Sequence, residues 1–105
     1  MGEVRGTELF ERMLAFNYED TERAELMRKV WSVTPFMVDC ETGSPGDASY
    51  QRIMKWCRRN FGPEAWPIHG RDGEWQSGTA TVFGWTWIGF KTQDQLDQFL
   101  ARKEP

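Results

Sequence analysis

The chain has little of the material that metal and covalent chemistry require. It contains one histidine and two cysteines, and Cys40 and Cys57 match neither a CxxC motif nor a zinc-ligand spacing. Small secreted domains usually carry more cysteines, so we expect both thiols to be reduced and dispensable. Because no nucleotide, metal or catalytic motif is present, the sequence predicts no cofactor and favours a protein that is not an enzyme.

Long apolar runs and a strong net charge are also absent. No stretch approaches the roughly 18 apolar residues of a membrane-spanning helix, and the N-terminal sequence MGEVRGTELF lacks the apolar core of a signal peptide. We therefore expect a cytoplasmic protein that does not enter a membrane. The net charge of −3, from 13 basic and 16 acidic residues, does not by itself indicate a nucleic-acid binder.

What the sequence does have is the composition of a folded domain. Of its 105 residues, 39% are hydrophobic and 28% are charged, which is typical of globular rather than disordered proteins. The length predicts a single domain over residues 1–105. Within it we expect an N-terminal helical hairpin over 7–33 and an α+β portion over 35–102.

Four segments carry apolar residues at helical spacing, each after a residue that can cap a helix. The caps are Thr7, Asp20 or Thr21, Asp47 and Thr92. The apolar stripes are Leu9, Phe10, Met13 and Leu14; then Leu26, Met27, Val30 and Trp31; then Tyr50, Ile53, Met54, Cys57 and Phe61; then Leu96, Phe99 and Leu100. Gly62 and Pro63 end the third helix, and Thr92 to Gln95 form a T-x-x-Q capping box.

The remaining apolar segments are predicted to be strands. These are 36–40, 74–76 and 79–90, with 66–69 as a short edge strand because Pro67 cannot donate to a central ladder. The 79–90 segment is either one central strand or splits near Gly84 into a tight hairpin. The resulting order, α-α-β-α-β-β-α, predicts an α+β fold: a small antiparallel sheet of three or four strands with helices packed on one face.

The aromatic residues raise the main functional question, because six tryptophans are many for one small core. Read as a strand, 79–90 places Val82, Ile88 and Phe90 on one face and Phe83, Trp85 and Trp87 on the other. Either Trp66, Trp75 and the helical hairpin cover these rings, or they form a patch for a partner, since Trp and Tyr are enriched at binding hot spots. Our candidate partner surface is Phe83, Trp85, Trp87 and Trp75.

Two other chemistries are weaker alternatives. The third helix carries Arg52, Lys55, Arg58 and Arg59 on its outer face, with Trp56 between them, and could contact the phosphates and bases of a nucleic acid. The single histidine, His69, could form a metal or acid–base site with Asp72, Glu74 or a cysteine. The usual reading of both features is a solvated surface, and the spacing of His69 from these possible partners matches no ligand pattern.

Two segments together resemble small accessory proteins of tailed phages and their bacterial hosts. These are WCRRNFGPEAW at 56–66 and GWTWIGFKTQDQLDQFL at 84–100. The resemblance implies a compact protein that works by binding, a class that includes inhibitors of bacterial defence such as anti-CRISPRs.

The expected function is therefore that of a non-enzymatic binding protein. We expect it to dock on a protein target, with a second copy of the chain as an alternative partner. Nucleic-acid binding through the third helix is the second hypothesis, and a small enzyme around His69 is the third.

Overall fold

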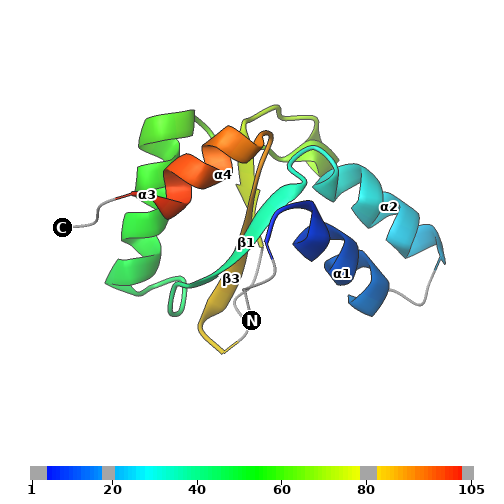
Figure 1. Ribbon diagram of the computed structural model, residues 1–105, viewed down its shortest axis with the longest axis horizontal. Helices are drawn as coiled ribbons and strands as arrows, with labels where there is room; N and C mark the ends of the chain where they lie inside the picture. Colours follow the sequence, from blue (N-terminus) through cyan, green and yellow to red (C-terminus); the bar gives the residue numbers. More distant parts are fainter. Residues whose placement is uncertain (1–4, 18–20, 79–82, 103–105) are drawn as a thin grey trace.

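The order of helices and strands is the one that the sequence predicts. A computed structural model describes residues 5–17, 21–78 and 83–102 (Figure 1). The elements are α1 (Thr7–Asn17), α2 (Thr21–Trp31), β1 (Phe36–Glu41), α3 (Ala48–Phe61), the 3-10 helix η1 (Pro67–His69), β2 (Trp75–Ser77), β3 (Trp85–Phe90) and α4 (Gln93–Leu100). This combination of helices and strands confirms the predicted α+β class. None of the helices among the described residues is long and apolar enough to cross a membrane.

The three strands form one antiparallel sheet in the order β1-β3-β2. The aromatic strand β3 is central, as predicted, because β1 pairs with one edge of it and β2 with the other. Phe90 is opposite Phe36 on β1 and opposite Trp75 on β2, while Trp85, at the start of β3, is opposite Glu41. The six-residue pairing with β1 fixes which β3 side chains share a face.

Helices cover both faces of the sheet, not one as expected (Figure 1). On one face, α3 and α4 enclose a core of nine buried residues: Val38, Ile53, Met54, Cys57, Trp75, Ile88, Phe90, Leu96 and Phe99. On the other face, α1 and α2 enclose a second core: Leu9, Phe10, Leu14, Val30, Trp31 and Met37. The predicted stripes of α1 and α3 are inward, whereas Leu26 of α2 is exposed. The N-terminal hairpin therefore forms a third layer.

Three close contacts attach this hairpin to the sheet. The side-chain amide of Gln76 donates to the carbonyl of Val30 and to Oγ1 of Thr34, both at 2.8 Å. The turn after α2 crosses the central strand at Gly89, where a Cβ atom would lie 2.5 Å from the Thr34 carbonyl oxygen. A one-residue bridge between Gly6 and Met37 fixes the chain that enters α1.

Two predicted strands differ from the structure. Within the predicted strand 66–69, Pro67–His69 instead form the 3-10 helix η1, and the Gly70 N–H donates to the Pro67 carbonyl at 3.1 Å; the fixed φ of proline suits the first turn of a helix. The strand predicted for 79–90 begins only at Trp85, because Phe83 and Gly84 have positive φ angles of 52° and 82°. Residues 79–82, and with them Val82, lie outside the described residues.

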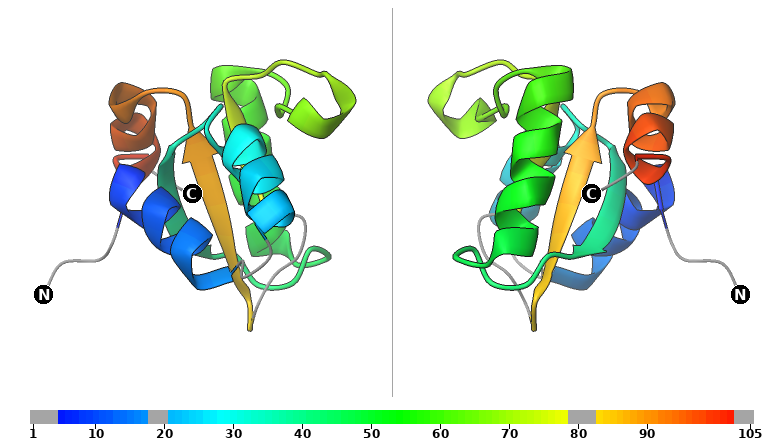
Figure 2. Two further views of the ribbon diagram at one scale, coloured as in Figure 1. Left: turned by 90° about the vertical axis from the view of Figure 1, so that its right-hand side faces the viewer. Right: turned by 90° about the vertical axis from the view of Figure 1, so that its left-hand side faces the viewer.

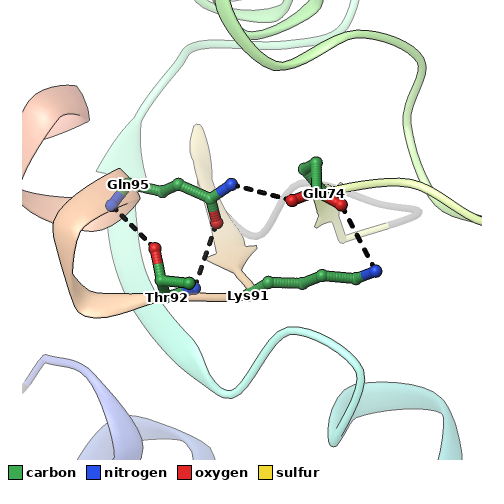
Figure 3. Close-up of polar contacts among 4 residues, drawn as sticks. All are labelled: Glu74, Lys91, Thr92 and Gln95. Carbon is green, nitrogen blue, oxygen red and sulfur yellow. Dashed lines mark hydrogen bonds and ion pairs between the residues drawn. The ribbon is translucent and has the colours of Figure 1, made fainter.

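The predicted helix caps differ in their outcome. Thr92 and Gln95 form the reciprocal capping box at the start of α4, which is confirmed (Figure 3). Asp47 stands at the N-cap of α3, but its carboxylate accepts no hydrogen bond from that helix. It accepts instead from the amide of Ser44 at 2.9 Å, which shapes the loop that joins β1 to α3.

Candidate docking surface

The first residues of β3 carry two exposed aromatic rings. Phe83 is fully exposed, and Trp85 is 44% exposed. In Figure 1 this end of β3 projects below the helices on both sides of the sheet. We refer to Phe83 and Trp85 as the aromatic tip. The backbone of Phe83 has a φ of 52°. A positive φ is uncommon for a residue other than glycine, and for a bulky side chain it costs roughly 1–2 kcal/mol.

A network of hydrogen bonds holds the aromatic tip in place. The amides of Thr42 and Gly43 both donate to the Gly84 carbonyl at 2.9 Å. The hydroxyls of Thr42 and Thr86 are hydrogen-bonded at 2.9 Å, and both threonines are buried. Ser49 of α3 donates to the Thr42 carbonyl at 2.6 Å. The turn before β3 is thus tied to β1 and α3, so a partner would not have to order it.

The other two residues of the predicted patch lie elsewhere. Trp87 is half-buried on the α1–α2 face, where its ring meets the edge of Trp31 at a centroid distance of 5.7 Å. Trp75 is completely buried in the core on the opposite face, and its indole N–H donates to the Gly62 carbonyl at 2.8 Å. The prediction that Trp75 belongs to the patch is wrong. Strand pairing with Phe90 places its side chain on the face that α3 and α4 cover.

Two carboxylates adjoin the aromatic tip. Glu41 is opposite Trp85 and Asp39 is opposite Trp87 in the β1–β3 ladder, on the face that α1 and α2 cover only in part. Both side chains are largely exposed, yet partial burial of the Asp39 carboxyl raises its pKa above the ordinary value. Neither acid is a predicted site residue. Their alternation with Met37 was visible, but only the strand register places them beside the rings.

The basic face of α3 is exposed but lacks a stacking ring. Arg52, Lys55, Arg58 and Arg59 all lie on the outer side of the helix. Trp56, however, is half-buried and packs edge-on against Phe61 at 5.5 Å and Phe99 at 5.7 Å. It belongs to the margin of the core, so the cations stand alone as a candidate phosphate-binding surface.

His69 and the cysteines are not brought together. His69 lies on η1, at the opposite end of the sheet from Cys40, which is near the end of β1 (Figures 1 and 2). His69 contacts the edge of Trp66, over whose ring the Arg71 guanidinium lies at 5.7 Å. Among the described residues, no three His, Cys, Asp or Glu side chains could jointly hold a metal ion.

Cys40 and Cys57 are not joined in a disulfide. Burial, with a smaller contribution from the nearby Cys40, raises the pKa of the Cys57 thiol to about 12. At neutral pH this thiol stays protonated, so it is unsuited to act as a nucleophile.

No protein-family model, curated protein or solved structure matches the chain with significance.

Proposed function

We propose that this chain is a non-enzymatic binding protein that docks on another protein through the aromatic tip. One observation carries the proposal: a fully exposed Phe83 held at a φ of 52° beside a half-exposed Trp85. Strained backbone that displays an apolar ring to water costs stability, and such outliers cluster at functional sites. Burying the Phe83 ring against a partner would contribute about 1.5–3 kcal/mol.

The chemistry of the tip fits a protein partner. Aromatic residues are enriched among the few interface residues that dominate binding energy. Trp85 offers both a large apolar ring and an indole N–H, and the hydrogen-bonded turn presents it in a fixed position. The resemblance of 56–66 and 84–100 to phage accessory proteins makes bacterial defence proteins the first class of target to test.

The test uses Phe83→Asn in quantitative affinity capture. Asn tolerates positive φ better than Phe, so this variant should be at least as stable as wild type in urea denaturation. It should nevertheless lose the protein that the wild-type chain captures from a lysate of its bacterial host. Trp85→Ala should weaken capture in the same way.

The matched control is Ile68→Ala, which removes an exposed apolar side chain from η1 at the other end of the sheet. Capture by this variant should equal that by wild type. The proposal is wrong if a folded Phe83→Asn chain captures its target as well as wild type does, or if the wild-type chain captures no protein.

The alternative function is nucleic-acid binding through α3, supported by the exposure of its four cations. Electrostatic binding of a nucleic acid falls steeply as salt rises, whereas an aromatic protein interface changes less. A gel-shift titration at two salt concentrations, with Arg58→Glu beside wild type, tests it. Binding that is lost at high salt and in Arg58→Glu would favour this function over the aromatic tip.

A further inference from the structure

The uncovered end of the sheet combines aromatic and acidic side chains on one face. Residues directly opposite in an antiparallel pair have their Cβ atoms about 4.5–5.5 Å apart. Glu41 therefore lies against Trp85, and Asp39 lies against Trp87 and diagonal to Trp85. The hairpin covers the other end of this face, where Trp31 packs on Trp87.

The charges of these carboxylates are not balanced within the described parts of the chain. The ion pairs found there involve Glu8, Glu11 and Glu74, and neither Asp39 nor Glu41 takes part in one. Neither side chain accepts a hydrogen bond from a described residue. Partial burial disfavours the charged form of Asp39, which raises its pKa, so a cation placed beside it would relieve an existing electrostatic cost.

Building on the proposed function, we propose that the aromatic tip, Asp39 and Glu41 form one docking surface for a protein segment that carries Lys or Arg beside an apolar side chain. The apolar side chain packs on Phe83 and Trp85, and the cation lies between the two carboxylates. A cation over the exposed Trp85 ring would gain a further contribution from its π face. Anionic surfaces, including nucleic acids and acidic membranes, are repelled from this end of the molecule.

A second copy of the chain fits this surface less well. Two copies that meet tip to tip bring four carboxylates together, which opposes association. Contact between the tip of one copy and η1 of another would pair the rings with Trp66, Ile68 and Arg71. The tip and η1 lie at opposite ends of the sheet, so this contact is head-to-tail (Figure 2). Such head-to-tail contact leaves a free tip and a free η1 on every pair of copies, so it satisfies all tips only where the copies close into a ring. The Arg71 guanidinium is also already engaged, because it donates to the Glu64 carbonyl at 3.2 Å and lies over Trp66.

The experiment selects a display library of short random peptides on the immobilised wild-type chain and discards peptides that also bind Phe83→Asn. The remaining peptides should be enriched in Lys or Arg next to aromatic or aliphatic residues. Titrated against Glu41→Lys, they should bind about tenfold more weakly or worse, equivalent to about 1.4 kcal/mol. The matched control Asp72→Lys makes the same charge change at the other end of the sheet and should alter affinity by no more than about twofold.

The outcomes separate the two proposals. If the Phe83-dependent peptides are neutral or acidic, or bind Glu41→Lys as well as wild type, the cationic partner is wrong while docking through the tip stands. If every selected peptide binds Phe83→Asn equally well, docking through the tip is itself wrong. Sedimentation of the chain alone should show a monomer; an oligomer that dissociates in Phe83→Asn would identify a second copy as the occupant and overturn the inference.

Discussion

Gly89 is the residue of the central strand against which the turn after α2 packs. A Cβ atom there would lie 2.5 Å from the Thr34 carbonyl oxygen and 2.8 Å from Thr34 Oγ1. Real Cβ atoms are not found at such distances from a backbone oxygen, so the turn after α2 would have to move away. The hairpin can therefore pack on the central strand only because position 89 has no side chain.

Gly89→Ala should lower the free energy of unfolding by about 1–3 kcal/mol, as other overpacking substitutions do. Urea denaturation measures this change. Gly46→Ala is the control, because a Cβ at Gly46 would meet no atom within 4 Å, and it should change stability by less than about 0.5 kcal/mol. Equal effects of the two substitutions would show that the α2 turn does not press on Gly89.

Asp39 gives the stability of the fold a defined pH dependence. Burial raises the folded-state pKa of Asp39 above its ordinary value of 3.8, so the folded chain binds a proton more readily than the unfolded chain does. The charged form therefore opposes folding above the raised pKa. As pH falls from that value toward 3.8, this unfavourable contribution disappears.

Asp39→Asn should consequently raise the thermal midpoint at pH 7, and its advantage over wild type should vanish below about pH 4. Melting both proteins across this range isolates the contribution of Asp39, because the other acids titrate alike in each. A variant that is less stable than wild type at pH 7 would mean that a cation already stabilises the charged form.

At the scale of the element, α4 shows how one helix end is joined to the sheet. Thr92 Oγ1 accepts from the Gln95 amide at 3.1 Å, and Gln95 Oε1 accepts from the Thr92 amide at 3.0 Å. The Gln95 side chain also donates to Glu74 at 3.1 Å, and Glu74 pairs with Lys91 at 3.3 Å (Figure 3). The capping box therefore fixes α4 relative to the residue that precedes β2.

Thr92→Ala should destabilise the protein by about 1 kcal/mol, the usual cost of losing an N-cap side chain. The matched control is Gln98→Ala, at an exposed position on the same helix, for which we expect almost no change. Chemical denaturation of the three proteins measures the difference. If both substitutions have the same effect, the capping box contributes nothing to stability.

At the scale of the whole molecule, two separate hydrophobic cores depend on one three-stranded sheet. Two adjacent residues of β2 form hydrogen bonds on opposite faces of the sheet. Gln76 donates to Val30 and Thr34 of the hairpin. The Ser77 hydroxyl donates to the Glu64 carboxylate on the other face at 2.7 Å. The buried Gln76 amide is thus a direct polar link between the sheet and the N-terminal hairpin.

Gln76→Ala should leave the Val30 carbonyl without this donor and cost about 1–3 kcal/mol. Hydrogen exchange should show the largest loss of protection in α1 and α2, with a smaller loss in α3. Ser77→Ala, which loses a contact on the opposite face, should leave the exchange of α1 and α2 unchanged. Uniform loss of protection in both variants would show that the hairpin does not depend on Gln76 in particular.

The sequence by itself determined the element order, the α+β class and the inward stripes of α1 and α3, because these follow from local periodicity and capping. The capping box at Thr92 and the stop at Gly62 belong to the same group, since residues a few positions apart decide them. The central position of β3 followed from its apolar character on both faces.

Only the tertiary structure decided which aromatic residues are exposed. Trp75 and Trp85 both lie in short apolar segments that the sequence predicts to be strands. Strand pairing places the Trp75 side chain in the core and leaves Trp85 exposed at the end of the sheet. The turn in which Phe83 has a positive φ is held by Thr42 and Gly43, about 40 residues away, whose amides donate to the Gly84 carbonyl. Asp39 and Glu41 join the surface for the same reason: strand register is a long-range property, and no local pattern specifies it.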